Sequence, residues 1–135
     1  MLRVQIMRVI YERLRAEVAL ALAARSGEAN YIRVARKGAR RLEREDSPMA
    51  RCFALLLRGG LAHLSGHREA AVRHLGDTVT ACEAADMRLY AAAARRRLGE
   101  VRGDAELVAQ ADEWMRNQEV RNPAHMTGML VPGWK

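Results

Sequence analysis

Two histidines four residues apart form the pattern in this sequence that comes nearest to a metal site. His63 and His67 have the i,i+4 spacing that places two ligands on one face of a helix. However, Ser65-Gly66 stands between them, and such a pair is typical of a helix end. We therefore expect the two rings to diverge, and we expect His74 at a helix surface. Because no Cys, Asp or third His stands at ligand spacing, we predict neither a metal ion nor another cofactor.

The acidic residues gather in two clusters that could serve general acid and base catalysis. One cluster is Glu43, Glu45 and Asp46, and the other is Asp112 with Glu113. Catalysis by a pair of carboxylates needs a His or a nucleophile close by, and neither cluster has one within reach in the sequence. We therefore expect both clusters to be solvated helix faces.

The two cysteines and the sequence motifs give no sign of an enzyme. Cys52 and Cys82 form no CxxC pattern, so we expect two reduced core residues and a cytoplasmic protein. Charged residues interrupt the first twenty-five positions, which argues against a signal peptide and against a membrane span. The patterns GxxxxGK[ST], GxGxxG, HExxH and GxSxG and the kinase catalytic loop are absent. We predict that this chain has no catalytic activity of its own.

Cations recur every three or four residues between positions 33 and 44, a spacing that forms one stripe along a helix. The stripe consists of Arg33, Arg36, Lys37, Arg40 and Arg44. It could contact phosphates or hold an acidic protein segment. Acidic residues bracket it and Tyr31 is its only aromatic neighbour, so a solvated face is the third interpretation. We take the first four cations as candidate partner-binding residues, with Arg58 and Tyr90 as weaker candidates. The net charge of +7 does not decide among these, since nearly all the cations are Arg.

The elements that must position these residues are all helices. Aromatic residues are few, and the apolar positions are mostly Ala, Leu, Val and Met, which favours closely packed helices over a sheet. Ser, Asp and Asn caps, first-turn Pro and terminal Gly divide the chain. The expected helices are about 2–25, 29–45, 48–64, 68–84 and 87–102, then a sixth that Asp104 caps, and a short one that starts at Asn122-Pro123.

The first helix has an apolar residue at every fourth position, and we expect this stripe to face the core. Its members are Ile6, Ile10, Leu14, Val18 and Leu22, with Met7, Tyr11 and Ala21 beside them, whereas Arg8, Glu12 and Arg15 are expected on the solvated side. No capping residue precedes the helix, so we expect the chain to be a piece of a longer protein. A first helix left uncovered would expose apolar surface and lead to a homodimer through this helix.

Glycine and alanine spacings in the middle of the chain resemble the tetratricopeptide repeat. The pattern runs Gly59-x-x-Ala62-x-x-x-Gly66-x-x-x-x-Ala71-x-x-x-Leu75, and Leu98-Gly99-x-x-x-Gly103 resembles the same corner one hairpin later. The resemblance implies an all-α fold, a short α-solenoid of antiparallel hairpins with about six helices and a C-terminal capping helix. We divide it into residues 1–118 as the repeat domain and 119–135 as the capping segment. A ligand would lie on the concave side, formed by the first helix of each hairpin.

The closing stretch has a more specific resemblance. Its pattern comprises Leu98-Gly99-Glu100, Gly103-Asp104, Ala111-Asp112-x-Trp114-Met115, Asn122-Pro123-x-x-Met126 and Met129-Leu130-x-Pro132-Gly133. This pattern is similar to the C-terminal end of bacterial, especially myxobacterial, eukaryotic-type serine/threonine kinases that carry an AAA-type ATPase module. The resemblance implies a regulatory or scaffolding tail whose partner is a protein, a peptide or another domain of the parent chain. The alternative is a basic nucleic-acid-binding helical regulator.

Both tryptophans lie in this closing stretch, where the last hairpin of a solenoid has no successor to cover its apolar face. Such an end needs a cap. We predict that Trp114, Met115, Met126 and Leu130 form it, and that the segment from Pro123 onward folds back across them. The same aromatic residues could instead contact a partner.

Overall fold

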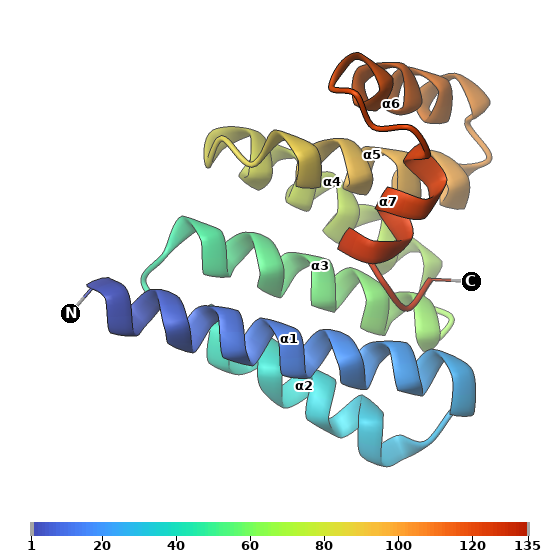
Figure 1. Ribbon diagram of the computed structural model, residues 1–135. Coiled ribbons are helices and arrows are strands. Elements are labelled where there is room, and N and C mark those ends of the chain that lie inside the picture. Colours follow the sequence, from blue (N-terminus) through green and yellow to red (C-terminus); the bar gives the residue numbers. More distant parts are fainter. Residues whose placement is uncertain (1, 135) are drawn as a thin grey trace.

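The computed structural model describes residues 2–134 and is all-α, as the sequence predicts (Figure 1). Within those residues the chain forms α1 (Leu2–Ser26), α2 (Ala29–Glu43), α3 (Pro48–Leu64), α4 (Arg68–Ala84), α5 (Arg88–Arg102), α6 (Ala105–Asn117) and α7 (Pro123–Leu130). Consecutive helices from α1 to α6 run antiparallel and pack against each other, and α1 also contacts α3. None of the described helices is both long enough and apolar enough to cross a membrane.

Side-chain caps fix the helix starts at the three positions where the sequence predicts them. Ser47 Oγ accepts a hydrogen bond from the Ala50 amide at 3.3 Å, and Asp104 Oδ1 accepts one from the Leu107 amide at 3.1 Å. Asn122 Oδ1 accepts from the His125 amide at 3.0 Å at the start of α7. Each bond satisfies an amide that has no partner inside its own helix, so these boundaries follow from local chemistry.

Small residues set the distance between α1 and α2. A Cβ added to Gly38 would lie 2.6 Å from Ala16 Cβ, closer than two carbon atoms can approach. Ala35 and Ala39 beside Gly38 are fully buried in the same contact. The near absence of large side chains at this contact lets the two helix backbones pack closely. This is the packing that an interior rich in Ala and Gly predicts.

The orientation of α1 differs from the prediction. The buried residues are Val9, Ala16, Ala19, Leu20 and Ala23, whereas the apolar stripe predicted to face the core is exposed along its whole length. The physical reason is that α1 is apolar on two opposite faces, and only its alanine-rich face fits the close contact with α2. The predicted solvated side is confirmed for Arg8, which is exposed and pairs with Glu45 of the α2–α3 turn, whereas Glu12 is half-buried and forms an ion pair with Arg41 of α2.

The C-terminal segment crosses from the last hairpin back to the first. Helix α7 packs against α5 and α6, and residues 131–134 continue toward α1 and α3 (Figure 1). Val131 is buried and its carbonyl accepts a hydrogen bond from Arg97 Nη2 at 3.2 Å. A Cβ on Gly133 would lie 2.8 Å from Leu20 Cγ of α1, and the Trp134 ring stacks on His63 with centroids 4.5 Å apart. The segment therefore links helices at both ends of the chain.

Candidate protein-interaction surface

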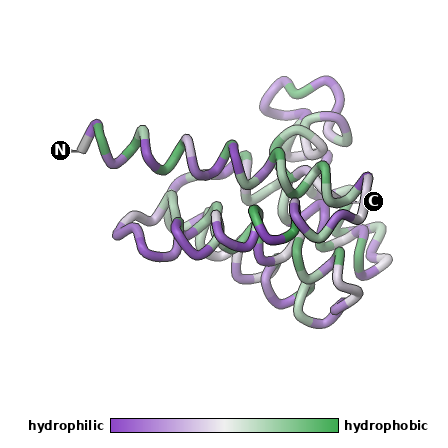
Figure 2. Tube along the Cα trace, turned by 90° about the horizontal axis from the view of Figure 1, so that it is seen from below, coloured by the Kyte–Doolittle hydropathy of each residue, from purple (hydrophilic) through white to green (hydrophobic). Residues whose placement is uncertain are grey.

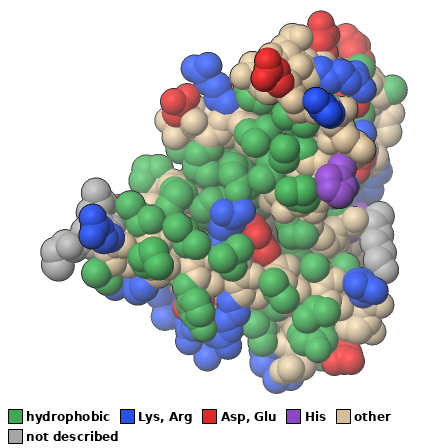
Figure 3. Space-filling model, in the orientation of Figure 1, with side chains coloured by type: hydrophobic (Ala, Val, Ile, Leu, Met, Phe, Trp, Pro, Cys, Tyr) green, Lys and Arg blue, Asp and Glu red, His purple; other side chains and the backbone are tan. Residues whose placement is uncertain are grey.

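The predicted basic stripe is an exposed face of α2. Arg33, Arg36, Lys37, Arg40 and Arg44 are all exposed, and they lie on the side opposite the buried residues of the helix. No ion pair within residues 2–134 involves any of these five side chains. At a rise of 1.5 Å per residue the stripe is about 16 Å long. Figure 3 shows blue side chains along the lower edge of the molecule, where Figure 1 places α2.

Arginines of other helices bind Glu43 and Glu45 next to this stripe, while Glu43 and Asp46 stay exposed, as expected for a solvated face. Arg58 of α3 donates to both carboxylate oxygens of Glu43, at 2.7 and 3.1 Å, and these hydrogen bonds lower the pKa of Glu43 below its usual value. Arg8 of α1 holds Glu45 in the same bidentate way, at 3.0 and 3.2 Å, and lowers the pKa of Glu45. Each carboxylate is thus held by an arginine of another helix, while the nearby charge of Arg40 in the stripe also lowers the pKa of Glu43.

The two weaker candidates do not belong to the same surface. Arg58 is half-buried and ties α3 to α2 through Glu43. Tyr90 of α5 lies edge-on to Phe53 of α3, with ring centroids 5.3 Å apart, and the Arg13 guanidinium sits 4.4 Å from the Phe53 centroid. Partial burial raises the pKa of the Tyr90 phenol. Both side chains thus serve contacts between helices, and the structure separates them from the exposed stripe.

The inner side, formed by α1, α3 and α5, is crossed by the chain's own C-terminal segment. His63 stacks on Trp134 and lines a surface cavity together with Arg68, Glu100 and Val101. His74 was expected at a helix surface, but it is half-buried and its Cβ lies beside Gly59, which also faces Trp134. Burial lowers the pKa of His74. The basic stripe lies on a different face, because α2 is the second helix of its hairpin.

His63 and His67 lie in different surroundings, and the two cysteines are buried in the core. His67 is exposed at the turn before α4, whereas His63 faces Trp134, so the two rings diverge as predicted. Cys52 and Cys82 are both free, buried and packed in one cluster with Ala91. Within residues 2–134, no three His, Cys, Asp or Glu side chains come together in an arrangement that could hold an ion.

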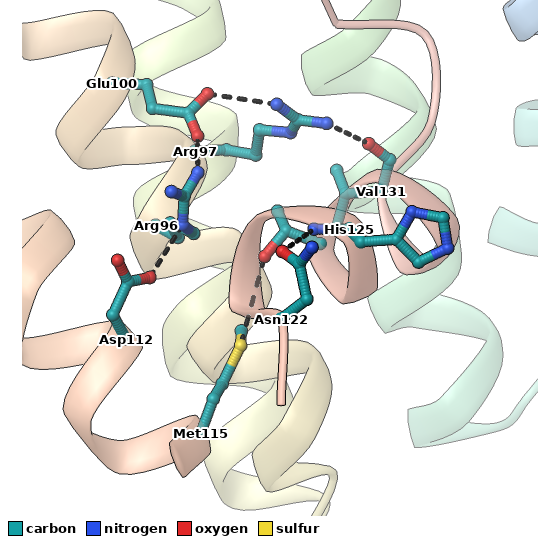
Figure 4. A network of polar contacts seen from close by, with 9 residues as sticks. Arg96, Arg97, Glu100, Asp112, Met115, Asn122, His125 and Val131 are labelled. Atoms are coloured by element: carbon teal, nitrogen blue, oxygen red, sulfur yellow. Dashed lines mark hydrogen bonds and ion pairs between the residues drawn. The ribbon is translucent and has the colours of Figure 1, made fainter. Parts of the chain in front are cut away.

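The four residues predicted to cap the last hairpin occupy different surroundings. Met115 is fully buried, and the Thr127 hydroxyl of α7 donates toward its sulfur at 4.0 Å (Figure 4). Met126 and Leu130 of α7 are half-buried. Trp114 is half-buried too, but it lines a shallow surface cavity with Ala91 and Arg95. Met115 therefore lies where α6 and α7 pack together, Leu130 lies near Leu20 of α1 and Leu57 of α3, and Trp114 lies beside α5.

Arginines of α5 hold the last helices together, and one of the three from position 95 was expected to point toward the neighbouring hairpin and pair there. Arg96 donates to Asp112 of α6 at 2.7 Å, so Asp112 is not the solvated carboxylate that was predicted. Arg96 and Arg97 both pair with Glu100, and Arg97 also reaches the Val131 carbonyl (Figure 4). The only sequence signal was the run of three arginines from position 95, which must point in different directions around one helix.

Comparison of the chain with models of protein families, with curated proteins and with solved structures gave no significant match.

Proposed function

We propose that this chain is a non-catalytic protein-interaction module whose α2 stripe binds an acidic segment of a partner protein. The observation that carries the proposal is the row of five exposed cations, Arg33, Arg36, Lys37, Arg40 and Arg44, next to carboxylates that are bound by other helices. A partner that presents carboxylates along about 16 Å would match the stripe in charge and length.

The wider context of the proposal comes from the sequence resemblances. The module would be a short tetratricopeptide-like solenoid, the C-terminal part of a bacterial signalling kinase or ATPase. The antiparallel order of α1 to α6 is compatible with such a solenoid. The partner would then be an acidic stretch of another protein or of another domain of the parent chain.

An acidic protein suits this surface better than nucleic acid does. The cations occupy one face of one helix, and Tyr31, the aromatic residue nearest to them, is half-buried. Binding of single strands normally combines cations with exposed aromatic rings on which bases stack. A single straight row of cations more closely matches one acidic helix or strand.

The experiment is a binding titration with a labelled acidic helical peptide of about twelve residues, the length of the stripe, followed by fluorescence anisotropy. We expect the variant Arg36→Glu/Lys37→Glu/Arg40→Glu to lose at least about tenfold in affinity, since opposite charges across an interface become like charges. The control is Arg73→Glu/Arg102→Glu/Arg121→Glu, which alters the net charge equally at exposed positions on other elements.

Two results would overturn the proposal. Equal losses in both triple variants would mean that the peptide responds to net charge alone. A DNA duplex of the same charge that binds more tightly than the peptide, with a steep salt dependence and the same loss in the α2 variant, would assign the stripe to nucleic acid instead.

A further inference from the structure

The outer face of α1 carries a continuous row of large apolar side chains. Val4, Met7, Tyr11, Leu14 and Val18 are between 51% and 63% exposed. Their spacing alternates between three and four residues, and Ala21 continues it. This alternation is the a/d pattern of helices that pair along their length. We call these six positions the α1 seam.

The α1 seam points directly away from the core. Val9, Ala16 and Ala23 lie seven residues apart on the opposite face, and all three are buried. Figure 2 shows α1 along one border of the molecule, and Figure 3 shows apolar side chains spread over the region where Figure 1 places this helix. A helix that is apolar on two opposite faces has the character of a helix buried on both sides.

We propose that the α1 seam binds the same seam of a second copy of this chain, with the two helices antiparallel. Pairing about a twofold axis between Tyr11 and Leu14 places Met7 opposite Val18 of the second copy. The same axis places Val4 opposite Ala21. The axis therefore pairs Tyr11 with Leu14, Met7 with Val18 and Val4 with Ala21. Both copies contribute the same residues, as a twofold interface requires.

The exposed apolar area is sufficient for such an interface. Eight large apolar side chains of α1 are exposed by more than a third, namely the five named above together with Ile6, Ile10 and Leu22. The exposed parts of all eight amount to about 800 Å², about what one partner contributes to an interface of standard size, and the seam supplies the larger part of this area. An apolar patch on a monomer more commonly covers about 300–600 Å².

The charges around the seam favour a second copy over a charged partner. No charged residue occupies the seam from Val4 to Ala21. At its borders Arg8 is paired with Glu45 and Glu17 with Arg13 at 2.9 Å, while Arg15 is exposed next to Tyr11 and Val18. The cations of α2 point away from the α1–α2 contact, so two copies joined at α1 would not bring their basic stripes together. A second copy supplies the uncharged face that this seam needs.

The first test is light scattering after size exclusion over a series of concentrations. We expect a dimer for the wild-type chain and a monomer with unchanged helical circular dichroism for Leu14→Glu and for Met7→Glu/Leu14→Glu. The control is Met129→Glu, which places the same charge at an equally exposed Met on α7 and should leave the dimer intact. A wild-type mass of one chain at every concentration would overturn the proposal, and so would equal dissociation of the Met129→Glu variant.

The second test fixes the orientation by disulfide formation under mild oxidation. In an antiparallel pair the two Val4 positions lie about 25 Å apart, because seventeen residues of helix rise separate each from its counterpart. We expect Val4→Cys/Ala21→Cys to form a covalent dimer and Val4→Cys alone to form none, while Cys52 and Cys82 stay buried. Rapid cross-linking of Val4→Cys alone would show a parallel pair and contradict the antiparallel register.

Discussion

At the scale of single residues, the carboxylates near α2 act as anchors between helices. Glu43 binds Arg58 of α3, Glu45 binds Arg8 of α1, and Glu12 of α1 binds Arg41 of α2. Each pair is partly exposed, and exposed ion pairs contribute at most about 1 kcal/mol of stability. Their larger effect is on position, because each carboxylate is held by an arginine of another helix.

Glutamine at position 43 should reduce the loss of stability in acid. Arg58 lowers the pKa of Glu43 in the folded state, so the pair stabilises the fold above the ordinary Glu value of about 4.5, and this stability is lost as the pH falls through the lower folded value. Denaturant unfolding measures the free energy of unfolding at pH 6 and at pH 3. The drop between the two pH values should be about 0.5 kcal/mol smaller for Glu43→Gln than for the wild type.

The control for this prediction is Glu69→Gln, at an exposed position on α4. Burial also lowers the pKa of His74, which makes the fold less stable in acid; the charge of Glu43 partly opposes this shift, so its removal in Glu43→Gln works against the predicted effect. If Glu43→Gln lost as much unfolding free energy between pH 6 and pH 3 as the wild type does, the ion pair with Arg58 would not form in solution.

At the scale of helices, the two faces of α1 explain where sequence reasoning succeeded and where it failed. The helix ends follow from caps and glycines, which act locally, so the prediction placed every helix to within about two residues. The inward face of α1 could not be read in the same way, because large apolar residues and small ones repeat with the same period on opposite sides. Only the contact of Ala16 with Gly38 selects the small face.

The same limit applies to the side chains of the candidate site. The spacing of the α2 cations was enough to predict one stripe, because a regular helix places residues three and four apart on one face. The partners of Glu43 and Asp112 lie on other helices, at positions that no local pattern specifies. Such contacts depend on how helices are rotated against each other, which is decided by packing.

Alanine at position 38 should destabilise the protein by about 1–3 kcal/mol, because its Cβ would overlap Ala16 and force α1 and α2 apart. The matched control is Gly76→Ala in α4, where no atom lies within 4 Å of the new Cβ. There the higher helix propensity of alanine should increase stability by up to about 1 kcal/mol. Thermal unfolding of both variants tests these two expectations. A higher melting temperature for Gly38→Ala than for the wild type would contradict the close contact between α1 and α2.

At the scale of the whole molecule, the C-terminal segment joins helices that are distant in the sequence. Trp134 contacts His63 and Gly59 of α3, and Gly133 packs on Leu20 of α1. Without this segment, α1 would be held mainly by α2 and α3, with Arg13 over the Tyr90 ring of α5. The segment therefore supports the inner side of the first hairpin, in addition to covering the last one.

Alanine in place of Trp134 should lower the free energy of unfolding by about 2 kcal/mol, since a large, partly buried ring is removed. Hydrogen exchange should accelerate in α1 around Leu20 as well as in α7. The matched control is Trp114→Ala on α6, which removes an equal ring and should leave exchange in α1 unchanged. Unchanged α1 exchange in Trp134→Ala would show that the segment does not support the first hairpin.

The contact between Gly133 and Leu20 joins positions more than one hundred residues apart, and this has a consequence for folding cooperativity. An array of hairpins that touch only their neighbours unfolds from its ends, hairpin by hairpin, and its stability is a sum of local terms. Because Gly133 packs on Leu20, the closing segment cannot separate from the last hairpin or from α1 without losing contacts to the other. Helical circular dichroism and tryptophan fluorescence should therefore report one coincident transition, and removal of residues 131–135 should split it into two.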